Sequence, residues 1–530
     1  MKKSSALSLT ALILLGAIFV ALGCWLRAHY APEWLRLDPS QHPPVLRPWA
    51  VEADCYSQLA RVQRILQGDG LIQNHFKVEN WPDGLVPSTT APFDYVILLL
   101  YAPLKLFTQY PLDWAGALVS PFLWVGLILF WTFFRSREFN RVGRFLLIVG
   151  FALLPELIWA TTFGRPRHQS LILMLMAMGL TAEYERWLPD LSSRRCWNIF
   201  AGIIWALACW TSLFEPAVVV TLLIVYNLVV RRKESFEFLV SYGGVMLVAL
   251  LLEGVHIFVP PPEYHEALLR WWSTIAELRG MNFITFRDQL TLIVLLLPLA
   301  AWRLLVRPGD HRTDLFLIIL ATLLTVMAIF QSRWGYYASL SLLFVLVRYC
   351  QVTPLRWPRV IVYAFFLIVA ADANSITVKA IASMPPNQPS PELAQIARSI
   401  NQPGGILAPW WLSPGLLYFS GQPIVTGSSH CGISGIVDGA KFYSATSWLD
   451  ANQILQKRQV RWVVVSDDPK FQYPLLNTSH GILGLPQVTD EDKGNADATV
   501  AQILITDRFV PTSLHLRAVT PQLKLYEYAP

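Results

Sequence analysis

An aspartate in a polar stretch of the chain is the first residue whose type and place could do chemistry. Asp54 lies within residues 47–92, which hydrophobic segments flank on both sides. Apolar residues recur at helical spacing after Asp54 until Gly68 and Gly70, which predicts an amphipathic helix with Asp54 in its first turn. The carboxylate could take part in proton transfer or could cap the helix, and this stretch alone leaves both alternatives open.

Three further short motifs carry ionisable side chains at places where hydrophobic segments meet. They are GRPRHQ with Arg165, Arg167 and His168, TIAE with Glu277, and QSRWGYY with Arg333. Each has a plain structural alternative, because arginines can snorkel or fix topology, and histidine and glutamate can sit at a hydrated interface. Taken together, carboxylate and imidazole suit Mg²⁺ or Mn²⁺, and guanidinium groups suit phosphate. The combination predicts transfer from a phosphate-linked donor embedded in the membrane.

The elements that must position these residues are membrane helices. Of the 530 residues, 54% are hydrophobic and 15% are charged, and the mean hydropathy is +0.42, which indicates a polytopic membrane protein. The net charge of +6 comes mainly from Lys and Arg in short loops, where these residues set orientation, so no nucleic-acid partner is expected. The six cysteines show neither metal-binding nor redox spacing.

About eleven spans are expected, beginning with a retained signal-anchor within residues 1–27. The others are expected near residues 112–134, 144–163, 169–188, 198–214, 216–230, 238–258, 289–306, 314–330, 336–350 and 358–376. Prolines interrupt residues 91–107, which we interpret as a re-entrant or interfacial segment. The alternate loops rich in Arg and Lys are predicted to be cytoplasmic, which places the motifs above on the exported face of a bacterial-type inner or cell membrane.

The hydrophobic runs stop near residue 376, and a proline-rich linker follows at 384–392. Residues 449–459 read as a helix and residues 460–468 as a buried strand, a succession typical of an α/β layer. The expected fold is therefore a polytopic α-helical membrane domain, residues 1–380, with exported loops at 28–111 and 259–288. An exported soluble α/β domain is expected at residues 381–530.

These motifs resemble those of the single-subunit oligosaccharyltransferases of bacteria and archaea, in the GT-C superfamily. The resemblance rests on Asp54 in the first long exported loop, the motif at the start of the fourth span, and Arg333 in its Gln-x-Arg-aromatic-x-Tyr setting. The TIAE motif matches the bacterial form letter for letter. The segment PWWLSPG, residues 409–415, falls where the family carries Trp-Trp-Asp-Tyr-Gly, so the resemblance extends over nearly the whole chain.

The resemblance implies a GT-C fold and an inverting transfer of a sugar or oligosaccharide. The donor would be a polyprenyl phosphate or pyrophosphate, and the acceptor an exported protein, lipid or glycan. The implied roles are catalysis by Asp54 and Glu277, metal binding by Asp54, His168 and Glu277, donor-phosphate binding by Arg333, Arg165 and Arg167, and acceptor binding by Trp410 and Trp411. The implied cofactor is a divalent cation, Mg²⁺ or Mn²⁺.

Two departures from the family pattern keep alternatives open. Arg167 stands where the second motif has an acidic ligand, and a guanidinium is no metal ligand, so Arg167 itself could supply the positive charge. Leu412 replaces the aspartate that recognises the hydroxyl of the acceptor, so acceptance of the usual Asn-x-Ser/Thr sequon does not follow. A non-catalytic relative that binds lipid-linked glycan is one alternative. A transporter or flippase is another, although the charges lie in exported loops and not at mid-span.

Overall fold

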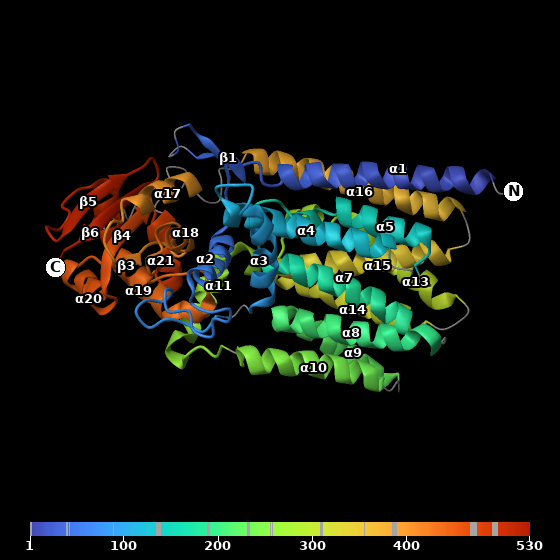
Figure 1. Ribbon diagram of the computed structural model, residues 1–530. Helices are drawn as coiled ribbons and strands as arrows, with labels where there is room; N and C mark the ends of the chain where they lie inside the picture. The colour runs from blue at the N-terminus through green and yellow to red at the C-terminus, as the bar shows by residue number, and fades with distance from the viewer. Residues whose placement is uncertain are drawn as a thin grey trace. The chain divides into compact units, whose positions relative to one another are not determined.

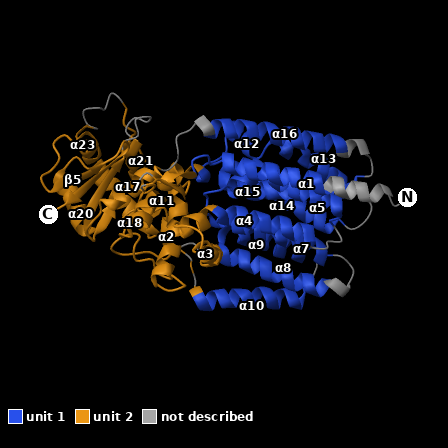
Figure 2. Cartoon of the chain, turned by 45° about the horizontal axis from the view of Figure 1, so that its top comes forward, with its two compact units in different colours: residues 1–34, 118–252, 277–385 blue, residues 35–117, 253–276, 386–530 orange. Residues whose placement is uncertain are grey.

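The computed structural model describes most of the chain, and the described residues fold into two compact units (Figure 2). The described residues are 3–38, 41, 43–87, 90–133, 139–187, 191–230, 234–254, 256, 258–307, 311–353, 356–383, 389–466, 474–489 and 497–529. Unit 1 comprises residues 1–34, 118–252 and 277–385, and unit 2 comprises residues 35–117, 253–276 and 386–530. Each unit is thus assembled from three separate stretches of the chain.

Unit 1 is a bundle of helices that run side by side (Figure 1). Its helices are α1 (Lys3–His29), α4 (Pro111–Phe133, which begins in unit 2), α5 (Arg141–Leu153), α6 (Pro155–Ala160), α7 (His168–Arg186), α8 (Leu191–Thr211), α9 (Phe214–Val229), α10 (Phe236–Glu253, whose last residue belongs to unit 2), α12 (Phe283–Gln289), α13 (Leu297–Val306), α14 (Arg312–Phe330), α15 (Gly335–Val352) and α16 (Arg356–Ser383). Three short 3₁₀ turns complete it: η2 (Ala276–Leu278), η3 (Leu292–Leu296) and η4 (Ser332–Trp334). Every stretch predicted as a span contains helix, so the helical character of these segments is confirmed.

The segment predicted as one span at residues 144–163 consists of two helices. Leu154 between α5 and α6 has an extended backbone with ψ of 124°, and Pro155 follows it. Proline disfavours the helical conformation of the residue before it and has no N–H to donate, so the helix ends there and a new one begins. The predicted single span is therefore interrupted at Leu154, between α5 and α6.

Four helices of the described part are long and apolar enough to cross a membrane: Pro111–Phe133, Phe236–Glu253, Arg312–Phe330 and Val360–Ile381. A fifth candidate is the bent pair Phe283–Gln289 and Leu292–Val306, whose axes differ by 82°. Ile13–His29, Pro92–Leu104 and Phe214–Val229 are shorter apolar helices. The apolar, helical character expected of a membrane protein is confirmed, and the count of about eleven spans stays a prediction.

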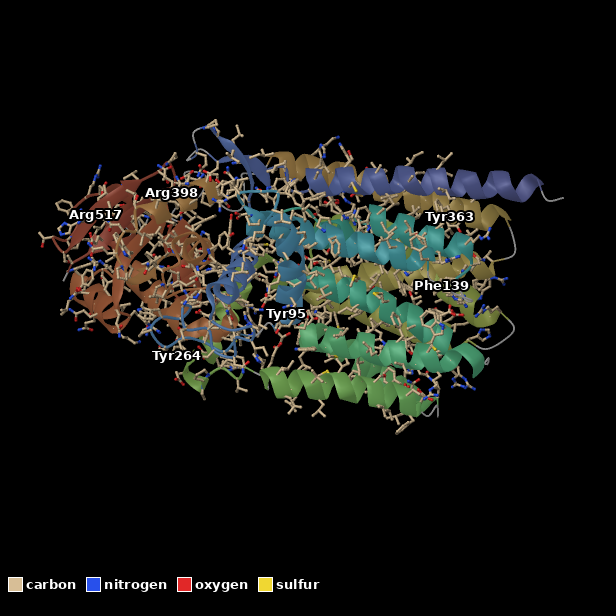
Figure 3. The ribbon with its side chains drawn as sticks, viewed as in Figure 1. Tyr95, Phe139, Tyr264, Tyr363, Arg398 and Arg517 are labelled. Carbon is tan, nitrogen blue, oxygen red and sulfur yellow. The ribbon has the colours of Figure 1, made fainter. Side chains whose placement is uncertain are left out.

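The core of unit 1 combines aromatic packing with close approaches between helices. The ring of Phe139, labelled in Figure 3, lies 5.1 Å from the ring of Tyr184 and 5.7 Å from that of Phe344, in edge-to-face geometry. A Cβ atom at Gly150 would lie 2.1 Å from a methyl carbon of Leu343, so α5 and α15 pack closely at this position. Residues 335–350 of α15 are all buried, which makes this helix the centre of the bundle.

Unit 2 contains a four-stranded sheet with the order β3-β4-β6-β5. Its strands are β3 (Gly405–Leu407), β4 (Val460–Ser466), β5 (Leu514–Val519) and β6 (Leu523–Tyr528). The pair β3-β4 is parallel, whereas β4-β6 and β5-β6 are antiparallel. Helix α20 (Trp448–Lys457) leads directly into β4, so the predicted helix-then-strand succession is confirmed. Residues 467–468 of the predicted strand lie outside the described residues.

The other elements within the described residues of unit 2 come from all three of its stretches. They are the hairpin β1 (Leu35–Asp38) and β2 (Val45–Pro48), the helices α2 (Ala53–Gln67), α3 (Pro92–Leu104), α11 (His265–Thr274), α17 (Ser390–Arg398), α18 (Ser413–Ser420), α19 (Ile433–Ser444), α21 (Pro474–Leu483) and α23 (Val500–Thr506), and the turns η1 (Pro262–Tyr264) and η5 (His430–Gly432). Helix α2 confirms the predicted amphipathic helix, with Asp54 in its first turn and Gly68 ending it at a φ of 102°. The stretch interpreted as re-entrant or interfacial contains α3.

Candidate functional site

The residues that the sequence singles out fall into two sets, one in each unit. Unit 1 holds Arg165, Arg167, His168, Glu277 and Arg333, and unit 2 holds Asp54, Trp410 and Trp411. The set in unit 1 converges from three separate elements: the start of α7, η2 and η4.

Arg167 and Glu277, which are 110 residues apart in the chain, form a two-pronged ion pair. Arg167 Nη1 donates to Glu277 Oε2 at 3.0 Å, and Nη2 donates to Oε1 at 2.8 Å. This fork-to-fork geometry is the strong arrangement for a guanidinium and a carboxylate. Burial by itself raises the pKa of the Glu277 carboxyl, but the charge and hydrogen bonds of Arg167, with the charges of Arg333 and Arg165, outweigh burial and lower the pKa to about 2. Glu277 is therefore ionised at neutral pH.

Arg165 is buried and held by backbone and aromatic groups. Its Nη1 donates to the carbonyl oxygen of Trp159 at 3.1 Å, and its Nη2 donates to the hydroxyl of Tyr336 at 3.2 Å. Its guanidinium also lies 4.5 Å from the centre of the Trp159 ring, within the range of a cation–π interaction. The main chain is fixed as well, because Ser120 Oγ donates to the Arg165 carbonyl oxygen at 2.6 Å.

Arg333 pairs with Glu215 at the start of α9, and Ser212 Oγ donates to the same carboxylate at 2.7 Å. Burial lowers the pKa of the Arg333 guanidinium, but the negative charges of Glu215 and Glu277 outweigh this and raise it. The Arg333 side chain is 23% exposed while Glu215 is buried, so Arg333 is both paired and partly exposed. His168 lies close enough to Glu215 for their charges to interact.

The buried hydroxyl of Tyr337 makes no hydrogen bond to the described residues. Tyr337 interacts electrostatically with Arg333. Buried hydroxyls are normally hydrogen-bonded, so this hydroxyl next to a partly exposed arginine is consistent with a polar ligand at this place.

Three side chains of this set were not expected from the sequence: Glu156, Glu215 and Tyr336. Glu156 is buried and interacts electrostatically with Arg165 and Glu277. A signal for two of them was present, because Glu156 and Glu215 are acidic residues within apolar runs, and such residues are functional candidates in a membrane protein. Nothing in the local sequence distinguishes Tyr336 from the other aromatic residues nearby.

The residues around Glu277 do not fit a divalent cation. Both carboxylate oxygens already accept N–H groups from Arg167, and the charges of Arg333 and Arg165 also act on this carboxylate. Within the described ranges, no group of three or more His, Cys, Asp and Glu side chains is arranged to hold a metal. A set dominated by guanidinium groups suits an anion such as phosphate.

In unit 2, polar side chains on one face of α2 contact other segments of the same unit. Ser57 Oγ lies 3.1 Å from Ser428 Oγ, and Gln58 and Arg61 both donate to Asp94 of α3, with Arg61 Nε at 3.2 Å from Asp94 Oδ2. Asp54 lies one helical turn before Ser57 and Gln58 and therefore on the same face. The backbone N–H of Ser429, next to Ser428, donates to Glu79 at 3.3 Å.

Glu79 is a buried acid that the sequence analysis did not single out. Burial raises the pKa of the Glu79 carboxyl, the hydrogen bond from the Ser429 N–H opposes this, and the negative charge of Asp54 adds to it, so that the pKa is about 7. A Cβ atom at Gly427 would lie 1.9 Å from Glu79 Oε1, so only glycine leaves room for this carboxylate. Asp54 thus has a second acidic residue in its neighbourhood.

The two tryptophans expected to contact the acceptor are partly buried. The ring of Trp410 lies 5.6 Å from that of Trp271 and 5.7 Å from that of Trp411, both edge-to-face. The indole N–H of Trp410 makes no hydrogen bond within the described part of the chain, so it could donate to a ligand. Leu412 is buried, and its side chain offers no acceptor atom.

Solved structures with the same fold exist, although no protein-family model and no curated protein matches the chain. The oligosaccharyltransferase AglB of Archaeoglobus fulgidus, in complex with an inhibitory peptide and a dolichol-phosphate, superposes with a TM-score of 0.65 at 12% identity, over 95% of this chain and 79% of that chain. A structure of the Archaeoglobus fulgidus oligosaccharyltransferase with Zn and sulfate has a TM-score of 0.63 at 12% identity, over 94% and 78%. ArnT from Cupriavidus metallidurans has a TM-score of 0.54 at 12% identity, over 99% and 98%. The resemblance to GT-C glycosyltransferases is confirmed in the fold.

Proposed function

We propose that the protein is an integral membrane glycosyltransferase. It moves a sugar or oligosaccharide from a polyprenyl phosphate or pyrophosphate to an exported acceptor, which is a protein, a lipid or a glycan. The observation that carries the proposal is the convergence of Arg165, Arg167 and Arg333 in unit 1, within a fold shared with glycosyltransferases. The proposal includes no nucleic-acid partner.

The proposal assigns the donor phosphate to unit 1. The Arg333 side chain is partly exposed, and a guanidinium carries five N–H donors, of which the bond to Glu215 uses one on Nη2. The N-terminal end of α7, where Arg167 and His168 lie, adds the positive end of a helix dipole. Positive groups fixed in place before the reaction stabilise the charge that develops on the leaving phosphate.

The proposal assigns proton removal to Asp54 in unit 2. An O–H or N–H group of the acceptor attacks the anomeric carbon of the sugar, and the bond from that carbon to the phosphate oxygen breaks. The proton passes to the Asp54 carboxylate, and the electron pair of the broken bond stays with the lipid phosphate. A positioned carboxylate typically contributes about 10²–10⁴-fold to such a step. Trp410 and Trp411 are proposed to contact the acceptor.

In the membrane, we place the soluble part of the chain on the exported side. Residues 381–530 form an exported α/β domain in this proposal, and the loops at 28–111 and 259–288 lie on the same side. The orientation is supported by the Arg- and Lys-rich loops on the alternate side of the predicted spans.

A second candidate is a relative that binds lipid-linked glycan without transferring it. Two features favour this candidate: Arg167 stands where a metal-binding acid is expected, and the buried Leu412 cannot accept a hydrogen bond from an acceptor. In that case the residues of unit 1 would keep their phosphate-binding role, and Asp54 would have no catalytic one.

The Asp54→Asn variant separates the two candidates, with lipid binding and turnover measured on the same reconstituted protein. Undecaprenyl phosphate, free and linked to a radiolabelled sugar, serves as the probe. A catalyst with Asp54 as base keeps its lipid affinity and loses turnover by about 100-fold or more. A wild-type protein that binds the lipid but transfers no label supports the second candidate, and an Asp54→Asn variant with wild-type turnover overturns the role of Asp54.

A further inference from the structure

The guanidinium of Arg167 stands at Glu277 where a cation would have to bind. Its two N–H groups engage both oxygens of the carboxylate, at 3.0 and 2.8 Å. Its main chain is fixed on both sides, because its N–H donates to the Arg165 carbonyl oxygen at 2.9 Å and its carbonyl oxygen accepts from Ser170 Oγ at 2.8 Å. The positive charge at this carboxylate is therefore covalently part of the chain.

The neighbouring charges would repel a divalent cation. Arg333 and Arg165 also act on Glu277, and Arg333 has its own carboxylate in Glu215. A cation at Glu277 would have to displace the buried Arg167 from its two-pronged ion pair and then remain beside three guanidinium groups. A phosphate is attracted by all three guanidinium groups, and each of them carries N–H donors that its ion pair or hydrogen bonds leave open only in part, while the Glu277 and Glu215 carboxylates oppose this attraction.

The buried Tyr337 hydroxyl is a further group that such a ligand would satisfy. It has no hydrogen-bond partner in the described part of the chain, and Tyr337 lies at the start of α15, four residues after Arg333 of η4. The Arg333 and Glu277 side chains are 23% and 24% exposed, whereas Arg167 is 7% exposed. Arg333 is thus the more exposed of the two guanidinium side chains, and Arg167 is the more buried one.

We propose that this donor-phosphate site works without a divalent cation: Arg167 takes the place of the metal at Glu277, and guanidinium groups led by Arg333 hold the phosphate. The inference rests on the proposed function and specifies the chemistry of its donor site. During transfer, the negative charge left on the lipid phosphate is balanced by side chains that are permanently charged, and no proton or electron moves at these arginines.

The first test measures binding of undecaprenyl phosphate to the reconstituted full chain, in EDTA and in excess Mn²⁺ or Mg²⁺. The expected result is the same dissociation constant within about twofold under all three conditions, since no cation bridges protein and phosphate. Affinity that falls tenfold or more in EDTA and returns with Mn²⁺ overturns the inference. A wild-type chain that binds no polyprenyl phosphate under any condition overturns the proposed function itself, so the two failures are distinguishable.

The second test replaces the guanidinium by a metal ligand. Arg167→Asp puts a carboxylate beside Glu277, so the variant should bind the lipid about tenfold or more weakly in EDTA and regain affinity with Mn²⁺. Arg167→Lys keeps the charge and should bind without any response to cations, which covers the case in which Arg167→Asp does not fold. A cation response in Arg167→Lys or in the wild-type chain contradicts the inference.

Arg195→Gln is the matched control for the loss of one positive charge. The Arg195 side chain is 78% exposed and lies 4.0 Å from Glu237, so its removal takes a charge from unit 1 without touching the Arg167 ion pair. Its lipid affinity should equal that of the wild-type chain. An equal loss in Arg195→Gln and Arg167→Gln would mean that net charge alone governs binding, and this would overturn the specific role of Arg167.

Discussion

Arg333 is the side chain on which donor binding should depend most. Its charge is balanced by the buried Glu215, and its exposed part is free to meet a phosphate. Arg333→Gln should weaken binding of undecaprenyl phosphate by about tenfold or more, because it removes a charge-assisted hydrogen bond. It should also cost about 3–5 kcal/mol of stability, because it leaves the Glu215 carboxylate buried without its partner.

A double variant separates these two effects of Arg333. In Arg333→Gln with Glu215→Gln, neither partner keeps a charge, so most of the lost stability should return while the lipid affinity stays low. Thermal unfolding and lipid binding of the same preparations provide the measurement. If affinity returns together with stability, Arg333 holds the fold and does not bind the phosphate.

The raised pKa of Glu79 predicts how the stability of the protein depends on pH. Burial and the charge of Asp54 raise the pKa of the Glu79 carboxyl to about 7, although the hydrogen bond from the Ser429 N–H opposes them. Between about pH 4.5 and 7 the folded state therefore binds more protons than the unfolded state. The contribution of Glu79 to stability is therefore fully present at low pH and is lost as the pH rises through this window. The melting temperature of the wild-type chain relative to Glu79→Gln should fall from pH 4.5 to pH 7 and then level off.

A constant offset between the melting temperatures of Glu79→Gln and the wild-type chain across this window would contradict the raised pKa of the Glu79 carboxyl.

At the scale of elements, the packing of α8 against α10 depends on one glycine. A Cβ atom at Gly202 would lie 2.1 Å from Ser241 Oγ and 2.6 Å from the carbonyl oxygen of Phe238. Gly202→Ala should therefore push the two helices apart and destabilise the protein by about 1–3 kcal/mol. Gly243→Ala on α10 itself meets no atom within 4 Å, so it should be neutral or slightly stabilising. Equal melting temperatures for the two variants would contradict the close approach.

Elements defined by local pattern could be predicted from the sequence, and elements defined by distant partners could not. The hydrophobic runs predicted the helices of unit 1, and the apolar spacing after Asp54 with Gly68 at its end predicted α2. The pairing of β4 with β6 joins residues more than 50 positions apart, and no local pattern encodes it. The ion pair between Arg167 and Glu277 is of the same kind, because both residues were singled out but the contact is set by tertiary packing.

At the scale of the whole molecule, the assembly of unit 2 from three separate stretches could not be predicted either. The sequence predicted the α/β character of residues 381–530, but the core of unit 2 also takes in Leu268 and Trp271 of α11, which pack with Ile433 and Ile436 of α19. Apolar residues at helical spacing indicate that a helix has a buried face, but they do not indicate which distant segment covers that face.

The proposed orientation in the membrane predicts the labelling of two cysteines. Cys196 is exposed in the first turns of α8, at the end of the span that the charge pattern places toward the cytoplasm. A cysteine in place of Phe509, which is 93% exposed, would mark the α/β domain. A membrane-impermeant maleimide added to intact spheroplasts should label Phe509→Cys, and it should reach Cys196 after the membrane is opened. The reverse pattern would place the α/β domain inside the cell.

Transfer of sugar from a polyprenyl-linked donor is measured most directly by following a labelled sugar in membranes that contain the protein. Membranes with the wild-type chain, Asp54→Asn or Arg333→Gln are given a polyprenyl-linked radiolabelled sugar, and label in the lipid donor, in protein and in other lipids or glycans is counted over time. With the wild-type chain in the presence of EDTA, label should leave the donor and enter an acceptor, and both variants should transfer far less. Label that stays on the polyprenyl lipid with the wild-type chain, or moves at the same rate with all three proteins, would contradict the proposed transfer.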